Sequence, residues 1–160
     1  MKDLARTRAG RDEPVARHQI DASPDDVFAA WVTPQILETW WGPEGFTTTV
    51  RRLDLVEGGR FAFEMTAPDG ASCVMTGVYK KIDRPTLLVF EIIDHCNLNL
   101  PHGVRPQQEP SLVTVRFSDC EGKTEIAVSH SLLNAEYAFI AVRSWSSAIA
   151  KISTSIRSCS

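Results

Sequence analysis

Hydrophobic residues repeat with two different periods along the chain, and the change of period separates helices from strands. Apolar and polar residues alternate over 15–20, which predicts a strand. Ser23 then precedes Pro24 and two aspartates, a pattern typical of a helix N-terminus. Apolar residues at helical spacing continue to Thr33-Pro34, where the proline ends the helix, and a second short helix is expected over 35–39.

From Phe46 onward the period falls to two residues and turn sequences become frequent. Strands are expected over 46–55, 60–67, 72–82, 86–93, 112–118 and 123–130. Short Gly, Pro and Asp clusters join most of them as hairpins. Residues 94–110 contain three prolines and show no periodicity, so a long loop is expected there. We expect this loop to be mobile, to tolerate shortening and to act as a lid, because loop length costs little entropy.

The last segment, 135–156, predicts one long helix. Its apolar or small residues fall on a single face: Tyr137, Ala141, Trp145, Ala148, Ile149, Ile152 and Ile156. One long sheet and one long helix to cover it make an α+β arrangement.

Composition and charge narrow the class of protein. The 160 residues are 43% hydrophobic and 23% charged, which suits one globular domain over 1–160 with a poorly ordered start at 1–13. The formal net charge of -3 argues against a nucleic-acid partner, which normally requires a basic stripe. No apolar run approaches the roughly 18 residues of a membrane helix, so no membrane partner is expected.

The four cysteines are interpreted as free thiols. Cys73, Cys96, Cys120 and Cys159 include no CxxC pair, and no secretory signal precedes them. The sequence therefore predicts a reducing, cytoplasmic location.

A set of short motifs runs through nearly the whole chain. They are Ile20-Asp21-Ala22-Ser23-Pro24, Val27-Phe28, Trp31, Pro34, Leu37, Trp40-Trp41-Gly42-Pro43, Gly45-Phe46, Asp54-Leu55, Glu57-Gly58-Gly59, Pro68-Asp69-Gly70, Gly77, Pro85 and Leu88-Val89-Phe90. Together they resemble the START-like (SRPBCC) superfamily, and within it the group similar to the C-terminal domain of the heat-shock protein 90 ATPase activator. The resemblance implies a helix-grip fold, in which a seven-stranded curved antiparallel sheet wraps around a long C-terminal helix and two short helices follow the first strand. It also implies a link to the stress response.

This fold implies a cavity between the sheet and the last helix, lined by inward-facing apolar residues. The residues assigned to it are Trp40, Phe61, Phe63, Met65, Phe90, Ile92, Val113, Val115, Phe117, Ala141, Trp145, Ala148 and Ile149. One register stays open on this face. A four-residue turn at 68–71 would add Val74, Thr76 and Val78, whereas a three-residue turn would add Cys73, Met75 and Gly77.

Polar candidates are few. His18 and His130 are expected to face the same interior and to meet there, because the fold would place the first and last strands side by side. His95, Cys96 and His102 are zinc-ligand types, but their spacing matches no closed site, so no metal and no cofactor are expected.

Three functions are compatible with these features. The first is non-enzymatic binding of a small apolar molecule that is lipid-like, aromatic or polyketide-like. The second is a co-chaperone-like module whose partner is a chaperone or another protein. The third is a cyclase or hydrolase that uses polar residues of the cavity, with His18 and His130 as its candidates.

Overall fold

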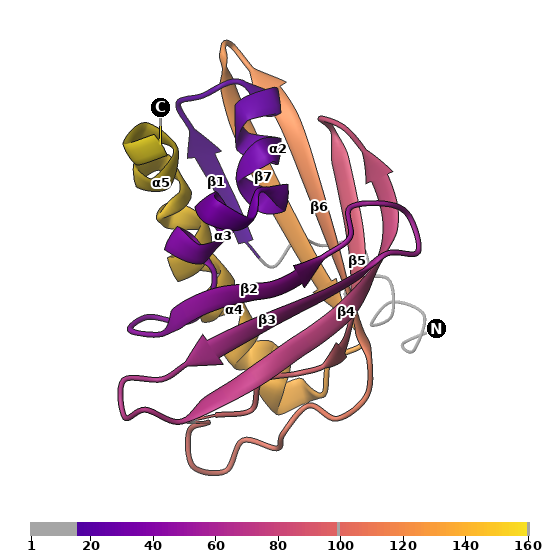
Figure 1. Cartoon of the computed structure of the whole chain (residues 1–160), viewed down its shortest axis with the longest axis vertical. Coiled ribbons are helices and arrows are strands. Elements are labelled where there is room, and N and C mark those ends of the chain that lie inside the picture. The colour runs from indigo at the N-terminus through magenta and orange to yellow at the C-terminus, as the bar shows by residue number, and fades with distance from the viewer. Residues whose placement is uncertain (1–15, 99, 160) are drawn as a thin grey trace.

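Seven antiparallel strands form one curved sheet in the computed structural model, which describes residues 16–98 and 100–159, and side chains as far as Ile156 (Figure 1). The expectation for residues 1–13 lies outside the described residues. The strand order is β1-β7-β6-β5-β4-β3-β2, so the first and last strands are neighbours as expected. The strands are β1 (Ala16–Ile20), β2 (Thr47–Leu53), β3 (Arg60–Thr66), β4 (Ser72–Asp83), β5 (Leu87–Asp94), β6 (Ser111–Cys120) and β7 (Lys123–Ser131).

Four helices accompany the sheet in the described part of the chain: α2 (Pro24–Val32), α3 (Pro34–Trp40), α4 (Ala135–Ala150) and α5 (Ile152–Cys159). The sheet curls around α4 and α5, and α2 and α3 follow the first strand (Figure 1). α4 contacts β1 and β7, whereas α5 contacts α2 and α3. This α+β helix-grip arrangement is the one that the sequence predicts. No helix in the described residues is both long and apolar enough to cross a membrane.

The helix ends follow from local chemistry. Ser23 caps α2, because its Oγ accepts a hydrogen bond of 3.2 Å from the backbone N–H of Asp26. The expected single C-terminal helix is divided at Lys151, where α4 ends. The Ser155 hydroxyl donates to the Lys151 carbonyl at 3.1 Å, a side-chain bond of the kind that bends helices.

The open register in β4 is resolved by the β3–β4 hairpin. The N–H of Ala67 donates to the carbonyl of Ala71 at 2.7 Å, which leaves a three-residue turn. Cys73, Met75 and Gly77 therefore share the inner face with β3, and Gly77 stands opposite Phe61. Any side chain at Gly77 would overlap the Phe61 ring, so this glycine makes room for an aromatic residue of the core.

A disulfide between Cys73 and Cys96 corrects the interpretation of these two residues as thiols. Their Cα atoms lie 5.7 Å apart although 23 positions separate them in the sequence. The register of β4 with β5 brings them together, and sequence spacing alone does not report this. Cys120 is a free thiol, and the Cys159 side chain lies outside the described residues. The cytoplasmic location thus loses the support of Cys73 and Cys96, and it stays a prediction.

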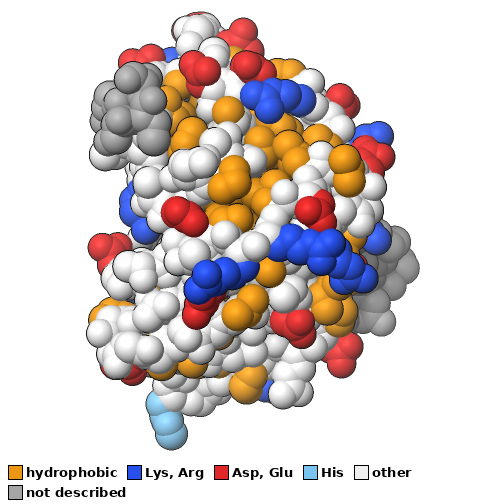
Figure 2. Space-filling model, in the orientation of Figure 1, with side chains coloured by type: hydrophobic (Ala, Val, Ile, Leu, Met, Phe, Trp, Pro, Cys, Tyr) orange, Lys and Arg blue, Asp and Glu red, His pale blue; other side chains and the backbone are white. Residues whose placement is uncertain are grey.

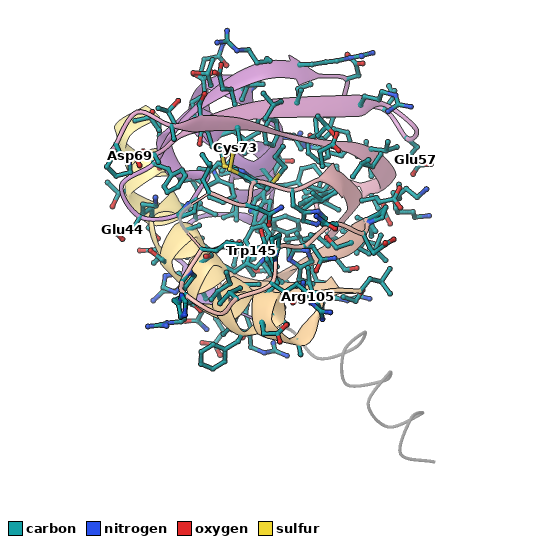
Figure 3. The ribbon with its side chains drawn as sticks, turned by 90° about the horizontal axis from the view of Figure 1, so that it is seen from below. Glu44, Glu57, Asp69, Cys73, Arg105 and Trp145 are labelled. Carbon is teal, nitrogen blue, oxygen red and sulfur yellow. A yellow bond between two sulfur atoms is a disulfide. The ribbon has the colours of Figure 1, made fainter. Side chains whose placement is uncertain are left out.

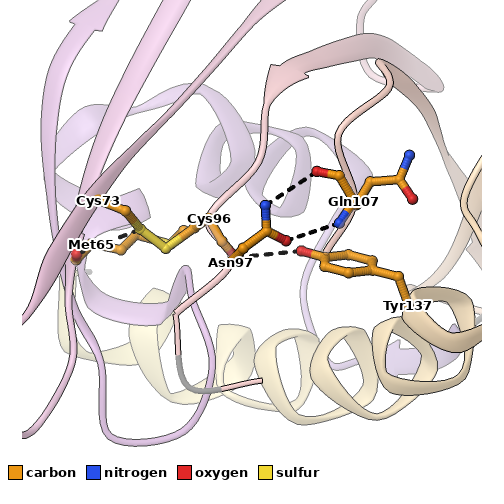
Figure 4. Close-up of a disulfide and its surroundings, with 6 residues drawn as sticks. All are labelled: Met65, Cys73, Cys96, Asn97, Gln107 and Tyr137. Carbon is orange, nitrogen blue, oxygen red and sulfur yellow. Dashed lines mark hydrogen bonds between the residues drawn. A yellow bond between two sulfur atoms is a disulfide. The ribbon is translucent and has the colours of Figure 1, made fainter. Parts of the chain in front are cut away.

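The long loop, residues 95–110 after the end of β5, is tied to the rest of the fold. Besides the disulfide, the Asn97 amide donates to the Gln107 carbonyl at 3.2 Å and accepts from its N–H at 3.1 Å (Figure 4). The Tyr137 hydroxyl donates to the Cys96 carbonyl at 3.5 Å. These contacts argue against the expectation that the loop can be shortened without loss of stability.

Candidate functional site

A partly enclosed cavity of about 100 Å³ lies between α4, the inner face of the sheet and the start of the 95–110 loop. The sheet contributes Met65, Met75 and Ile92, one each from β3, β4 and β5. The connection from α3 to β2 closes another side, with Trp41 and Phe46 among its residues. Most of the lining is apolar, and within residues 16–98 and 100–159 no lysine, arginine, aspartate or glutamate contributes to it.

Small residues on α4 leave the space open. Ala141, Ser144 and Ala148 all line the cavity and follow one another at helical spacing on its inner face. Viewed along the molecule from below, Trp145 projects from α4 into the interior, while Glu44, Glu57 and Asp69 lie toward the edge (Figure 3). A larger residue at the alanine positions would occupy the cavity itself.

Tryptophan rings form the inner end of the cavity. The ring of Trp145 meets Trp41 edge-on, with centroids 5.5 Å apart, and stacks on Trp31 at 5.7 Å. Trp40 is fully buried, and its Nε1–H donates to the Ala30 carbonyl at 2.9 Å. Each large ring is thus fixed by packing or a hydrogen bond, which makes this wall rigid.

Four side chains form a hydrogen-bonded series at the polar end of the cavity, from α4 across β7 and β6 to the end of β5. Trp145 Nε1 lies 3.0 Å from His130 Nδ1. His130 Nε2 lies 2.8 Å from Ser111 Oγ, which in turn lies 2.7 Å from His95 Nε2. Val113 pairs with His130 and Ile92 pairs with Ser111, so neighbouring strands of the sheet bring these groups together.

Both histidines are neutral at physiological pH. Burial, with a smaller contribution from the nearby His95, lowers the pKa of His130 to about 3. Burial lowers the pKa of His95 to about 4, against the opposing effect of the Asp94 carboxylate. Burial also raises the pKa of Tyr137, another cavity residue, to about 12, so its hydroxyl keeps its proton.

The direction of the series is fixed from its Trp145 end, because an indole N–H is a donor only. Trp145 donates to Nδ1 of His130, so the proton of the neutral His130 ring is on Nε2 and is donated to Ser111. The Ser111 hydroxyl has no other acceptor among the described groups, so we assign its proton to the bond with Nε2 of His95, which leaves the His95 proton on Nδ1. That Nδ1 atom is buried and has no hydrogen-bond partner.

The residues assigned to the cavity from the sequence divide into two groups. Those that line it are Trp40, Met65, Ile92, Ala141, Trp145, Ala148 and His130. Those that are buried in the core elsewhere are Phe61, Phe63, Phe90, Val113, Val115, Phe117 and Ile149. Alternation along a strand identifies its inner face but not which part of that face borders a cavity, and contacts of any of these residues with a ligand stay a prediction.

His18 and His130 do not form the expected pair. His18 is opposite Ile126 in the β1–β7 register, four residues from His130. The partner of His130 is instead Ser111, with His95 beyond it. Sequence reasoning missed Ser111, and it considered His95 only as a metal ligand.

The zinc-ligand types of the loop are not arranged as a metal site. Cys96 is bonded to Cys73, and in the described ranges no three His, Cys, Asp or Glu side chains are grouped to hold a metal ion.

On the face drawn in Figure 2, basic and acidic side chains are interspersed, so this face has no large patch of a single charge.

Comparison with known proteins shows which family and which solved structures this chain is similar to. The family model described as Activator of Hsp90 ATPase homolog 1-like protein matches residues 21–156. A solution structure of a protein from Arthrobacter aurescens is 24% identical, with a TM-score of 0.72 over 89% of this chain and 84% of that one. An AHSA1-like protein from Aeromonas hydrophila is 23% identical, with a TM-score of 0.71 over 90% of this chain and 92% of that one.

More distant structures share the same fold. A protein from Nitrosomonas europaea is only 13% identical, yet its TM-score is 0.73 over 91% of this chain and 94% of that one. No curated protein matches the sequence significantly. The match over residues 21–156 and the shared helix-grip fold lead to one conclusion: the chain belongs to the Activator of Hsp90 ATPase homolog 1-like family of the START-like superfamily.

Proposed function

We propose that the protein binds a small, largely apolar molecule in the cavity between the sheet and α4. The observation that carries this proposal is a space of about 100 Å³ with apolar walls, kept open by Ala141 and Ala148. Protein interiors normally pack densely, with few voids larger than one water. Binding of an apolar guest in such a space is favourable by about 25 cal/mol for each Å² of apolar surface that is removed from water.

The size of the cavity limits the part of a ligand that is enclosed. A single water needs about 10–15 Å³, and an engineered apolar cavity of about 150 Å³ admits a benzene ring. The cavity described here is of the same order as the one that admits benzene, so it suits one ring or a short acyl chain. Half-buried residues around it, such as Phe46, Leu98 and Ile140, would contact any part that extends outward.

The test is titration with N-phenyl-1-naphthylamine, a neutral dye whose fluorescence rises in apolar surroundings. We expect a saturable site in the native protein. Ala141→Phe and Ala148→Phe should each abolish it, with the fold preserved by circular dichroism. Val142→Phe is the matched control, because Val142 belongs to the same helix but is 42% exposed, and it should bind like wild type.

Two results would count against this function. One is the absence of any saturable site in the wild type. The other is destabilisation of Ala141→Phe and Ala148→Phe by about 1–3 kcal/mol together with unchanged dye fluorescence, which is the behaviour of an overpacked solid core.

A second candidate is a co-chaperone-like interaction, as the family description suggests. The supporting observation is a set of exposed apolar side chains just before α4 and within its first half: Leu132 at 66%, Phe139 at 70% and Val142 at 42%. Stimulation of a heat-shock protein 90 ATPase that is lost in Phe139→Asp, with dye binding intact, would favour this function over the first.

A further inference from the structure

We infer that the cavity selects a neutral ligand that carries a carbonyl-type oxygen, and that Nδ1–H of His95 donates a hydrogen bond to that oxygen. The inference rests on the proposed ligand-binding function and goes beyond it by naming the class of ligand. Three observations lead to it: the direction of the hydrogen-bonded series, the unpaired atom at its end, and the absence of charge in the cavity wall.

The direction of the series makes His95 a donor toward the ligand. Trp145 can only donate, which puts the proton of His130 on Nε2, and among the described groups the Ser111 hydroxyl then finds an acceptor for its own proton only at Nε2 of His95. The terminal Nδ1 of His95 therefore carries a proton. It can bind an acceptor, whereas accepting from a ligand hydroxyl would require the Ser111 proton to turn away from His95 and lose its acceptor.

The terminal donor has no partner among the described side chains and backbone. Its surface is buried, and buried N–H groups in proteins almost always find an acceptor. Leaving such a group unpaired costs free energy comparable to a lost hydrogen bond. His95 also lines the cavity, so a bound molecule would lie against its ring, and we expect a small turn of that ring on binding to bring Nδ1 to an acceptor on the ligand.

The absence of charge in the wall favours a neutral ligand. No lysine or arginine of the described residues lines the cavity, and both histidines are uncharged. A carboxylate enclosed there would lose its hydration without gaining a counter-ion, which is strongly unfavourable. A ketone, aldehyde, ester or amide oxygen needs only a donor, and His95 supplies one.

The experiment compares two probes of nearly the same shape, acetophenone and α-methylstyrene, in which a carbonyl oxygen is replaced by a methylene group. Dissociation constants are measured by displacement of the dye from wild type and from His95→Phe. We expect His95→Phe to weaken acetophenone binding about fivefold to tenfold relative to α-methylstyrene, the fold-change of one hydrogen bond.

A second variant acts one step away from the ligand. Ser111 does not line the cavity, so Ser111→Ala preserves the shape of the site but removes the group that holds the His95 tautomer. We expect it to reduce the preference for acetophenone as well. Long-range ¹H–¹⁵N spectra of the wild type should show His95 protonated on Nδ1 and His130 protonated on Nε2.

The outcomes separate this inference from the proposed function. If both probes displace the dye but their affinity ratio is the same in wild type, His95→Phe and Ser111→Ala, the inference is wrong and the binding function stands. If the dye binds at a saturable site but neither probe displaces it, the inference is wrong and the binding function stands, whereas the absence of a saturable dye site would overturn both. A His95 ring protonated on Nε2 in the wild type would also overturn the inference, whether or not the variants fold.

Discussion

At the scale of single residues, the polar end of the cavity depends on His130, whose side chain is almost entirely enclosed. Both of its ring nitrogens are occupied, one by Trp145 and the other by Ser111. A second proton would have to displace the Trp145 donor from Nδ1. Protonation of His130 is therefore coupled to disruption of the series.

We expect the protein to lose stability as the pH falls below about 6.5. The pKa of His130 is about 3 in the folded protein, below its value of about 6.5 in an unfolded chain. Between these values the unfolded chain binds a proton that the folded chain does not, so the free energy of unfolding decreases with falling pH. At about pH 5 the loss from this residue is about 2 kcal/mol.

His130→Gln provides the control for this pH dependence, because glutamine retains a donor and an acceptor but does not titrate. We measure the free energy of unfolding by urea at pH 7.5 and at about pH 5. The difference between the two pH values should be smaller in the variant than in wild type. Equal differences in the two proteins would show that His130 is not the group responsible. His95, with its pKa lowered to about 4, should contribute in the same direction in both.

A second residue-scale prediction concerns the aromatic core. Phe63 is 3% exposed and packs edge-on against Trp41, with centroids 5.1 Å apart. Phe63→Asp should lower the free energy of unfolding by about 4 kcal/mol or more, because a buried carboxylate has neither water nor a partner. Phe139→Asp makes the same exchange at a 70% exposed site and should change stability little. Equal melting of Phe63→Asp and wild type would contradict the assignment of this face.

At the scale of elements, the 95–110 loop and the start of α4 form one hydrogen-bonded unit. Asn134 caps α4 by accepting from the Tyr137 N–H at 2.8 Å, and its own amide donates to the carbonyls of Arg105 and Pro106. Gln107 is buried in the middle of this unit. The first residues of the loop line the cavity, and these bonds fix its other end to α4, so the loop is not simply a connection.

Gln107 is the residue on which this unit depends. Its side chain donates to the carbonyls of Glu109 and Leu132 and accepts from the N–H of Asn134 at 2.8 Å. Gln107→Leu should lower the free energy of unfolding by about 3 kcal/mol, because several backbone groups lose their partners. Amide hydrogen exchange should rise in the loop and in the first turn of α4.

The neighbouring Gln108 is exposed, which makes Gln108→Leu the matched control. Its stability and exchange rates should stay close to those of wild type. If Gln107→Leu resembled this control, the side-chain hydrogen bonds of Gln107 would not be what holds the loop.

Removal of the disulfide should also loosen the loop. Closing a chain segment of 23 positions stabilises a protein by about 3 kcal/mol in the chain-entropy model. The double variant Cys73→Ser and Cys96→Ser should therefore melt about 6–12 °C below oxidised wild type, a shift typical of a domain of this size. A reducing agent should lower the melting temperature of wild type but not that of the double variant, and Cys120→Ser should behave like wild type.

At the scale of the whole molecule, the cavity lies where the sheet, α4 and the connection from α3 to β2 meet, so a ligand there would contact elements from distant parts of the chain. Such a ligand binds the folded state only. Acetophenone at about ten times its dissociation constant should then add about 1.4 kcal/mol of stability. This corresponds to a rise in melting temperature of about 3–6 °C. Ala148→Phe should show no such rise, and a rise of equal size in that variant would place the binding site elsewhere.

The sequence by itself determined the elements and their order. Alternation of apolar residues, the Ser23-Pro24 helix start and the turn sequences predicted the seven strands and the two short helices close to their observed bounds. These features are local, since each depends on the conformational preferences of a few neighbouring residues. The motifs that resemble the START-like superfamily then implied the helix-grip fold, which the structure and the family match confirm.

Only the tertiary structure decided which residues meet inside that fold. The Cys73–Cys96 disulfide and the series from Trp145 to His95 join residues on different elements, and strand register and helix placement bring them together. Likewise, sequence patterning identified the inner faces, but the cavity opens beside Ala141 and Ala148 and not beside Phe61 and Phe63. The physical reason is that periodicity reports the direction of each side chain separately, whereas a contact or a void depends on the sizes and positions of several side chains at once.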